Sequence, residues 1–561
     1  MNPRTTLTIA FLFVSFFIIQ GVGFIRANSQ THDEAVHLAA GYSYLTTRDF
    51  RLNPEHPPLT KELAALPIFL WHKLAFKPDT SEWDQADQYA IGRKFLYDSA
   101  VPASQLLALG RIPSLALGVL LVTSIGWWAH RLWGKGAMLI AIALASLEPN
   151  LIAHSSLITT DVGVTLFIFL ACYFLWEYSN SQSWRYLAGS GVALGLALAS
   201  KYSAVLLPVI LGVAIMVQLL FAGGLSLPWR RRLTESKLWR WGVEAGGVFL
   251  FILFFAALII PGSYFFQGFS PWLDGLLEFF QHSQDGHAAF FLGEHSYDGW
   301  WNYFLVAFLI KTPVGSLILI VASIVFWRWG KALDSRAAIF LLLPVVTFFL
   351  ATTQAKVDIG LRHILPVYPF LFVLAARLAT IQVGPGRLVH LLVGVPLILT
   401  AISSLRISPH QLAYFNEIVG GPDHGYRYLA DSNLDWGQDL RGVKAYMEKE
   451  KLPIIYLSYF GTAPPAYYGI LYQYVPGTWP LEWPLPADRV PTDAPRKILA
   501  ISANNLQELA TFNDPLFRWL EARQPMTKIG YSIFVYDLTH DPEGLKDLAV
   551  TYDKAGVNLS D

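Results

Sequence analysis

The sequence predicts a polytopic α-helical membrane protein that ends in a small α/β domain. Of its 561 residues, 54% are hydrophobic and 15% are charged, whereas soluble domains carry about a quarter charged residues. The 19 Trp residues are typical of a chain with aromatic rings at membrane–water interfaces. The formal net charge of +0 gives no basic surface for nucleic-acid binding. The single cysteine, Cys172, excludes disulfides and cysteine-cluster zinc sites.

Apolar runs indicate about eleven transmembrane helices. A helix needs about 20 apolar residues to cross the hydrocarbon core of a bilayer. We expect helices at 7–26, 104–129, 136–150, 158–178, 186–200, 203–222, 242–265, 303–327, 337–353, 363–381 and 388–405. The first run lacks the small-residue cleavage pattern of a signal peptide, so it is predicted to remain as an anchor.

Basic loops predict the orientation in the membrane. The segments 130–135, 228–240 and 328–336 are rich in Lys and Arg and fall on one side when the helices are counted. Short cytoplasmic loops carry an excess of these residues, so this side is predicted to be cytoplasmic. The long segments at about 27–103 and 266–302 then face outward.

The outer segments contain predicted elements of their own. Residues 34–47 and 59–74 have the spacing of amphipathic helices that lie along the membrane surface. The composition changes near residue 406, which predicts a transmembrane domain at 1–405 and an extracytoplasmic α/β domain at 406–561. In the second domain we expect a helix capped by Asp435 and strands at 454–460, 497–503 and 528–538.

An acid pair follows the first transmembrane run. Asp33 and Glu34 lie where a membrane helix gives way to an interfacial one, and His37 follows one helical turn later. A carboxylate near a helix start can act as a cap that stabilises the helix by about 1 kcal/mol. Partly desolvated carboxylates instead have raised pKa values and take a proton from a hydroxyl. The pairing of two acids at the bilayer edge favours the second interpretation.

The polar stretch NPEHPPLTKE at 53–62 interrupts the first outer segment. The residue before each proline is driven to extended geometry, so Glu55, His56 and the two prolines predict a rigid elbow. A proline in the first turn of a helix that begins at Leu59 accounts for the prolines alone. Glu55 and His56 therefore remain candidate site residues.

Further candidates lie at the outer ends of the helices. Asp161 is predicted either to cap a helix or to act as a functional acid. Lys201, Lys311, Arg362 and His363 supply the basic side chains there. Extension to the lipid head groups is the alternative for Lys201 and Arg362. Lys311 lies about two turns inside its predicted helix, where a charge is costly unless it is paired or faces a polar cavity.

The acids and cations gather at one membrane face but come from separate segments. Cations bind phosphate, and carboxylates supply a base. A polyprenyl-phosphate sugar suits this layout, because its tail lies in lipid, its phosphate at the interface and its sugar outside.

These segments resemble two known families. Asp33-Glu34 after the first helix, followed by His56-Pro57-Pro58-Leu59, resembles the protein O-mannosyltransferases, and the bacterial lipid A aminoarabinose transferases have a similar layout. Both are GT-C glycosyltransferases that use polyprenyl-phosphate sugars. LITTDVGVTLFIFLACYFLWEY, GLALASKYSAVLLPV and GLRHILPVYPFL resemble later family segments, so the resemblance covers most of residues 1–405.

The resemblance implies a GT-C-like fold and a role for each candidate. Asp33 is the expected general base on the acceptor, with Glu34 beside it. The residues expected at the donor phosphate are His56, Lys201, Lys311 and Arg362. The further site candidates are His37, Glu55, Asp161 and His363.

A divalent metal ion is left open by the same resemblance. In the aminoarabinose transferases the elbow reads Glu-Lys-Pro-Pro, and its Glu lies near a bound metal. Glu55 matches that Glu, and His56 replaces the Lys. A histidine of the 266–302 loop, namely His282, His287 or His295, is the expected second ligand, but one carboxylate and one imidazole do not specify a site.

The predicted function is a bacterial inner-membrane glycosyltransferase. It is expected to move a mannose-like hexose, with inversion, from a polyprenyl-phosphate donor to a protein, lipid or glycan acceptor on the outer face. One alternative is a lipid or solute transporter or flippase, which would place its ionisable site near the bilayer midplane in repeated halves. The other is a non-catalytic subunit that presents the tail domain to partners. The charges at one edge and the lack of an internal repeat favour the transferase.

Overall fold

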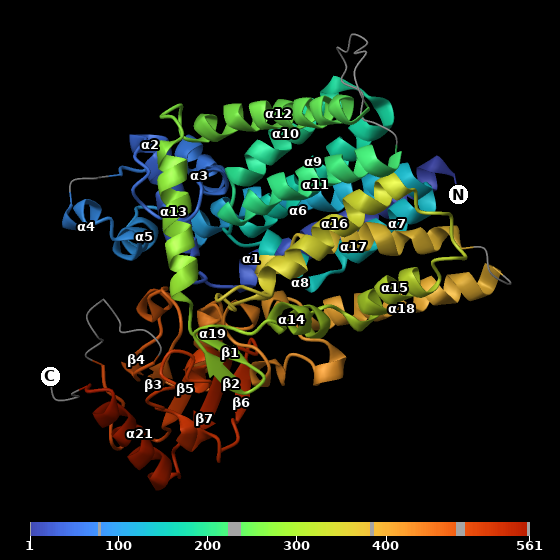
Figure 1. Ribbon diagram of the computed structural model, residues 1–561. Helices are drawn as coiled ribbons and strands as arrows, with labels where there is room; N and C mark the ends of the chain where they lie inside the picture. The colour runs from blue at the N-terminus through green and yellow to red at the C-terminus, as the bar shows by residue number, and fades with distance from the viewer. Residues whose placement is uncertain (1, 77–79, 223–236, 382–385, 478–487, 558–561) are drawn as a thin grey trace.

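The computed structural model describes residues 2–76, 80–222, 237–381, 386–477 and 488–557. A bundle of long helices forms one part of the molecule, and a sheet domain formed by the C-terminal part of the chain packs against one end of it (Figure 1). Most of the predicted cytoplasmic segment 228–240 lies outside the described residues.

Six helical segments in the described chain are long and apolar enough to cross a membrane, or up to eight if each of two bent pairs is one span. The six are α1 (Pro3–Ala27), α6 (Ala103–Trp133), α9 (Asp161–Ser181), η1 with α11 (Leu206–Ala222), α12 (Lys237–Ser263) and α16 (Ser335–Thr352). The bent pairs are α7 (Lys135–Ser146) with α8 (Pro149–Ser155), and α14 (Tyr303–Lys311) with α15 (Val314–Val325). Shorter apolar helices are α10 (Trp184–Leu198), α17 (Val367–Ala376) and α18 (Gly386–Ile407). The polytopic helical fold is confirmed, because each predicted run contains a helix, while the number of eleven spans stays a prediction.

The expected continuous helix at 303–327 is wrong. Its two parts, α14 and α15, meet at an angle of 111°. Thr312 is extended, with φ −92° and ψ 133°, as expected for a residue before a proline, and Pro313 has no amide hydrogen to donate. Lys311 therefore lies at a corner of the chain and not inside a straight helix.

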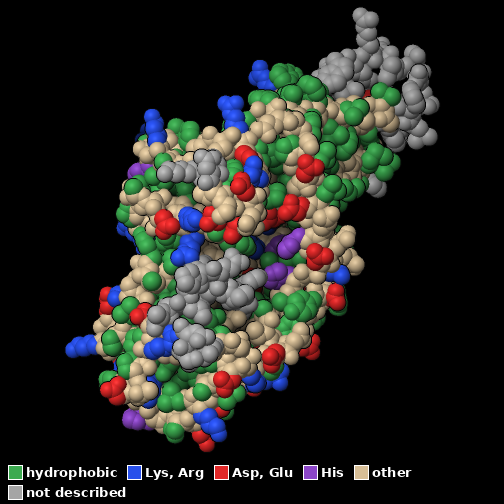
Figure 2. All heavy atoms as spheres, turned by 90° about the vertical axis from the view of Figure 1, so that its left-hand side faces the viewer, with side chains coloured by type: hydrophobic (Ala, Val, Ile, Leu, Met, Phe, Trp, Pro, Cys, Tyr) green, Lys and Arg blue, Asp and Glu red, His purple; other side chains and the backbone are tan. Residues whose placement is uncertain are grey.

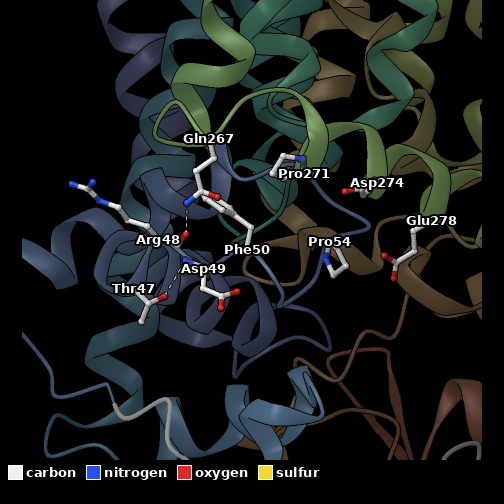
Figure 3. A pocket seen from close by; sticks show the side chains of 10 residues that line it. Thr47, Arg48, Asp49, Phe50, Pro54, Gln267, Pro271, Asp274 and Glu278 are labelled. Atoms are coloured by element: carbon white, nitrogen blue, oxygen red, sulfur yellow. Dashed lines mark hydrogen bonds between the residues drawn. The ribbon is translucent and has the colours of Figure 1, made fainter.

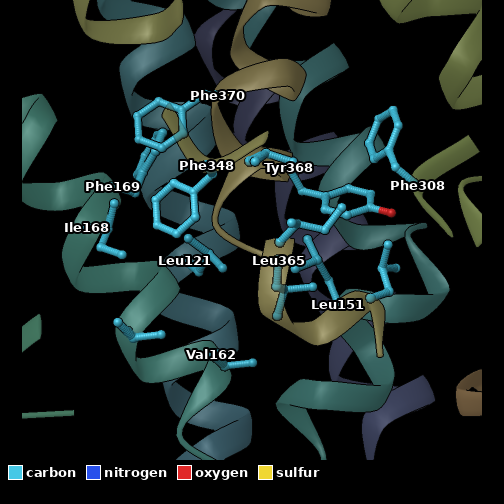
Figure 4. Close-up of a cluster of buried hydrophobic side chains, with 14 of the residues drawn as sticks. Leu121, Leu151, Val162, Ile168, Phe169, Phe308, Phe348, Leu365, Tyr368 and Phe370 are labelled. Atoms are coloured by element: carbon cyan, nitrogen blue, oxygen red, sulfur yellow. The ribbon is translucent and has the colours of Figure 1, made fainter. Parts of the chain in front are cut away.

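A shared apolar core joins the membrane helices. Buried side chains from α6, α8, α9, α14, α16 and α17 interdigitate in its centre (Figure 4). They include Leu121, Leu151, Phe169, Phe308, Phe348 and Tyr368. Such close packing is rigid, so the helix ends that carry the polar side chains are held in fixed relative positions.

The first outer segment folds as α2 (Glu34–Thr47), α3 (Leu59–Trp71), α4 (Ser81–Asp84) and α5 (Gln88–Tyr97) around a second core. Both predicted helices are present, but the amphipathic character expected for residues 34–47 is wrong, because α2 is buried along most of its length. Its position along the membrane surface stays a prediction. A Cβ at Gly41 of α2 would lie 2.0 Å from the carbonyl oxygen of Lys61. Glycine therefore allows α2 and α3 to cross closely enough to exclude lipid and water from α2.

The C-terminal part contains a five-stranded sheet in the order β4-β3-β5-β7-β6. β3 (Ile455–Ser458) pairs in parallel with β4 (Tyr472–Tyr474) and β5 (Ile498–Ser502), whereas β7 (Ile533–Asp537) is antiparallel to β5 and to β6 (Thr527–Ile529). The predicted α/β character is confirmed. The single strand expected at 528–538 is a hairpin instead, since Gly530 and Tyr531 have positive φ between its arms. The helix expected to be capped by Asp435 begins at Leu440, so that cap is wrong, and Asp439 occupies the N-cap position.

The remaining elements are short or connect the two parts. They are α13 (Ser270–Asp285), β1 (Ala289–Phe291), β2 (Glu294–Ser296), α19 (Leu440–Lys449), α20 (Ala503–Leu506) and α21 (Pro542–Lys554). The 3-10 helices are η1 (Tyr202–Val205), η2 (Leu361–Ile364), η3 (Arg377–Thr380), η4 (Gln411–Ala413), η5 (Glu417–Val419), η6 (Gly425–Arg427), η7 (Asp431–Asn433), η8 (Pro465–Tyr468) and η9 (Arg518–Leu520). In Figure 1, α13 extends from the end of α12 towards the C-terminal domain.

Candidate active site

Asp33 immediately precedes α2 and faces two basic side chains. Its Oδ1 lies 3.3 Å from Nδ1 of His32, and its Oδ2 lies 3.3 Å from Nη1 of Arg362. Among the described residues its side chain makes no hydrogen bond that caps α2, and 25% of it is exposed. Burial alone would raise the pKa of Asp33, but the hydrogen bond from His32 and the charge of Arg362 hold that pKa well below its usual range. The carboxylate is therefore ionised, accessible and balanced by cations.

Glu34 has a different environment from its neighbour. Nε and Nη2 of Arg111 donate to its Oε1 and Oε2 at 2.7 and 2.6 Å. The backbone amides of Ile158 and Thr31 donate to the same two oxygens at 3.0 and 2.8 Å. Both side chains are almost fully buried, at 0% and 1% exposure. Glu34 thus forms a closed ion pair that ties the start of α2 to α6.

Asp161 and Lys201 form a second buried pair. Nζ of Lys201 lies 2.6 Å from Oδ1 of Asp161, and the two side chains are 8% and 1% exposed. Lys201 therefore does not extend to the lipid head groups. In the described part of the chain, Oδ2 of Asp161 has no hydrogen-bond partner. One acceptor of the pair is left facing the interior.

Several other buried polar atoms near these pairs also lack partners within the described chain. They are Nδ1 of His56, Nδ1 of His154, Nε of Arg362 and Nε2 of His363. The charges of Lys201 and Arg362 act on both Asp161 and His363, which places these groups in one cluster. Buried polar groups in proteins are normally hydrogen-bonded. A group of unpartnered donors and acceptors around two cations therefore points to a polar ligand.

The elbow at 53–58 is held by a buried lysine. Nζ of Lys61 donates to the carbonyl oxygens of Asn53 and His56 at 2.8 and 2.7 Å and to the hydroxyl of Tyr44 at 2.8 Å. The centroids of the His56 and His37 rings lie 5.2 Å apart. Burial, together with the charges of His37 and Lys61, lowers the pKa of His56 well below its usual range. His56 is therefore a neutral side chain for hydrogen bonding and not a phosphate-binding cation.

Glu55 points towards the first outer segment. Its Oε1 accepts hydrogen bonds from Nδ2 of Asn53 at 2.8 Å and from Nε2 of Gln88 at 3.2 Å. His295 instead contacts the C-terminal domain, where its Nε2 lies 2.6 Å from the carbonyl oxygen of Gln507.

The other two candidate metal ligands of the 266–302 loop are His287 and His282. His287 has its Nδ1 2.9 Å from the carbonyl oxygen of Ala288, and His282 is exposed near the end of α13. A search of the described residues finds no group of three or more His, Cys, Asp or Glu able to hold a metal. The residues present do not fit the expected divalent ion, and no chemical step is assigned to it.

Lys311 is occupied by backbone carbonyl groups. Its Nζ donates to the carbonyl oxygens of Leu412, Tyr414 and Asn433 at 3.1, 3.0 and 2.5 Å. These three bonds use every donor of the ammonium group. Lys311 thus fastens the corner after α14 to the start of the C-terminal domain, and Lys201 and Arg362 remain the cations of the cluster.

Helix α13 lies directly over the elbow. A Cβ at Gly275 would lie 2.1 Å from the hydroxyl of Tyr202 and 2.4 Å from the carbonyl oxygen of Pro54. Glycine therefore allows the helix to touch both the elbow and the residue after Lys201. Beside this contact is a cavity of about 520 Å³, into which Asp49, Asp274 and Glu278 project (Figure 3). Figure 2 shows acidic, basic and histidine side chains in a band across the middle of the face that it draws.

Sequence reasoning missed two residues of this region. Arg111 lies within the predicted run 104–129, and a charge in a transmembrane run is a functional or structural signal in itself. His154 belongs to α8, and its signal was a polar side chain in the short connection before Asp161. Of the predicted site residues, the structure brings together Asp33, His37, His56, Asp161, Lys201, Arg362 and His363.

Comparison with known proteins gives one family match and several structural ones. The family "Dolichyl-phosphate-mannose-protein mannosyltransferase" matches residues 105–260. Crystal structures of ArnT from Cupriavidus metallidurans match at 13% identity and TM-score 0.46 in the apo state, and at 12% and 0.47 with undecaprenyl phosphate bound; each covers 94% of this chain and 97% of ArnT. The Pmt1-Pmt2 complex of S. cerevisiae matches at 20% identity and TM-score 0.32, over 50% of this chain and 34% of that one. No curated protein gives a significant match. Residues 105–260 of the chain are therefore similar to the dolichyl-phosphate-mannose-protein mannosyltransferase family, which the sequence resembles.

Proposed function

We propose that this protein is a glycosyltransferase that moves one sugar from a polyprenyl-phosphate donor to an acceptor outside the membrane. The observation that carries the proposal is the cluster in which the ionised carboxylate of Asp33 lies beside Arg362. Nearby are the Asp161–Lys201 pair and buried polar atoms that have no partner among the described residues. The cations suit the donor phosphate. The unpartnered atoms suit the hydroxyl groups of a sugar, which donate and accept hydrogen bonds.

The positions of the charges support the following reaction. The acceptor nucleophile gives its proton to Asp33 and attacks the anomeric carbon from the face opposite the phosphate. The bond between that carbon and the phosphate oxygen breaks, and its electron pair leaves with the phosphate. A displacement in line inverts the configuration. Arg362 and Lys201 stabilise the negative charge that develops on the leaving phosphate.

Donor binding also changes the basicity of Asp33. In the free protein, the charge of Arg362 contributes to the low pKa of this carboxylate, and a carboxylate with a low pKa is a weak base. A donor phosphate attracts the same guanidinium and weakens its contact with Asp33. Asp33 then becomes a stronger base only when the donor is in place.

The other predicted residues are assigned supporting roles. Glu34 fixes the backbone at Asp33 through its ion pair with Arg111. Neutral His56, with His37 beside it, donates or accepts a hydrogen bond at the donor. Lys311 holds the C-terminal domain in place instead of touching the phosphate. Helix α13, in the 266–302 loop, covers the site from the outer side.

We assign the sugar to the hexoses, with mannose the first to test, because the family match names a mannose donor. We place the protein in the inner membrane of a bacterium with its C-terminal domain outside. Native Cys172 is buried, so it gives little background in labelling. A cysteine placed at exposed Asp423 is expected to react with a membrane-impermeant maleimide in intact spheroplasts. Labelling only after lysis would reverse the assigned orientation.

The function is tested with purified full-length protein in lipid nanodiscs. Radiolabelled polyprenyl-phosphate mannose, glucose and aminoarabinose are supplied separately, with envelope membranes as the source of acceptor. The expected result is release of polyprenyl phosphate and transfer of label, and fractionation then shows whether protein, lipid or glycan receives it. Intact donor in every arm would overturn the proposal. Movement of intact donor across a vesicle membrane would instead identify a flippase.

A further inference from the structure

Two aromatic rings of the C-terminal domain lie against the two basic residues that hold Asp33. The guanidinium carbon of Arg362 lies 4.3 Å from the centroid of the Trp436 ring. The ring of Phe460 stacks on that of His32, with centroids 5.6 Å apart and planes 25° apart. Arg362 and His32, the two basic partners of Asp33, therefore each pack against an aromatic ring of the C-terminal domain.

Backbone hydrogen bonds fix the two rings relative to Asp33. The amide of His32 donates to the carbonyl oxygen of Trp436 at 2.9 Å, and the hydroxyl of Thr462 donates to the carbonyl oxygen of His32 at 2.8 Å. Three residues earlier, the amide of Ser29 donates to the carbonyl oxygen of Gln438 at 2.8 Å. The segment before Asp33 is thus joined to the loop that carries Trp436.

The Trp436 ring has no freedom to move away from Arg362. It is 2% exposed and packs with Phe24, Ala153, Leu157, Leu412 and Phe460. These neighbours come from α1, from the region of α8 and from the C-terminal domain. The ring therefore offers a fixed planar surface, and a planar guanidinium lies flat on such a surface.

We propose that the C-terminal domain completes the active site and that Trp436 is a positioning residue, which holds the Arg362 guanidinium between Asp33 and the donor phosphate. This inference rests on the proposed glycosyl transfer. The guanidinium of Arg362 contacts the Trp436 ring and the Asp33 carboxylate at the same time. Without the ring, Arg362 has other orientations available, and both its contact with Asp33 and its reach to the phosphate are weakened.

The test compares Trp436→Leu with Trp436→Phe. The control is Trp184→Leu, which makes the same change at a half-exposed ring distant from Trp436 in the sequence. Transfer of radiolabelled mannose from its polyprenyl phosphate is measured in nanodiscs. We expect kcat/KM to fall about ten-fold in Trp436→Leu, to recover largely in Trp436→Phe because a planar face remains, and to stay unchanged in the control.

A pH profile separates positioning from a general loss of structure. His32, His37, His56 and Arg362 are the charged or titratable groups that act on Asp33. If Arg362 leaves Asp33, the pKa of this carboxylate rises, so the acid limb of kcat/KM moves to higher pH in Trp436→Leu and returns in Trp436→Phe. An unshifted acid limb in Trp436→Leu, or equal defects in the two variants, would overturn the inference.

Two further results keep the outcomes distinct. Wild-type protein without transfer activity would refute the proposed function itself, whereas an active wild type with an unaffected Trp436→Leu refutes only the role of Trp436. If Trp436→Leu does not fold, Phe460→Leu makes the equivalent change behind His32. It is expected to move the acid limb in the same direction, and an unchanged limb would count against the completing role of the domain.

Discussion

Asp33 and Glu34 are adjacent acids that each face an arginine, yet their surroundings differ in every other respect. Glu34 accepts four hydrogen bonds, two of them from Arg111, and is fully buried. Asp33 meets Arg362 at a single 3.3 Å contact and keeps a quarter of its surface exposed. A carboxylate with every lone pair used has no capacity for a substrate proton. In this acid pair, the carboxylate with free hydrogen-bond acceptor positions is therefore the candidate base. The carboxylate whose acceptor positions are all used holds it in place.

The largest effect is expected from Asp33→Asn. The amide has the shape of the carboxylate but takes no proton, so kcat for release of polyprenyl phosphate should fall by about 10²–10⁴-fold. The melting temperature should fall less than in variants of the fully buried Glu34, because the Asp33 side chain is partly exposed and its contacts with His32 and Arg362 are both 3.3 Å long. Undiminished transfer in Asp33→Asn would remove the general base from the mechanism.

Glu34→Gln is the matched variant at the next residue. It leaves the buried charge of Arg111 without a counter-ion, which costs about 3–5 kcal/mol. We expect a large fall in the melting temperature, measured in detergent by tryptophan fluorescence. The double variant Glu34→Gln with Arg111→Met removes both charges and should recover part of that loss. Equal stability of Glu34→Gln and wild type would contradict the structural role given to this acid.

The Asp161–Lys201 pair combines both behaviours, because it is buried like Glu34 but has one carboxylate oxygen with no partner in the described part of the chain. Lys201→Met should destabilise the protein, since it leaves a buried carboxylate alone. Adding Asp161→Asn should restore stability while kcat stays about 10²-fold low, because a cation at the leaving phosphate is still missing. Thermal unfolding and transfer assays on the same preparations separate the two effects. Recovery of activity in the double variant would show that Lys201 serves stability alone.

The sequence predicted which residues are unusual better than it predicted what they contact. Each predicted apolar run contains a helix in the described residues, because hydropathy is a local property. Asp33 and Arg362 were identified as an acid and a cation at the same face, but their contact depends on the packing of segments 329 residues apart. Lys311 looked like a phosphate ligand for the same reason. Its three carbonyl partners come from backbone geometry that no side-chain pattern records.

Asp435 is a third buried acid for this comparison, because its surroundings shift its pKa in the direction opposite to that of Asp33. Burial raises the pKa of Asp435 from an ordinary 3.8 to about 8, and nearby Asp439 adds to the rise. Between these two values the folded protein binds more protons than the unfolded chain. Stability should therefore fall as pH rises from about 4 to 8, by at most about 1.4 kcal/mol per pH unit.

Asp435→Asn has no proton to lose there, so its unfolding free energy should vary less over the same pH range. Asp423→Asn, at an exposed carboxylate, is the control and should keep the wild-type slope. Chemical unfolding at several pH values measures both. An unchanged slope in Asp435→Asn would mean that Asp435 is already ionised in the fold and that burial without a cation does not hold it neutral. The cations around Asp33 would then not be what distinguishes the two acids.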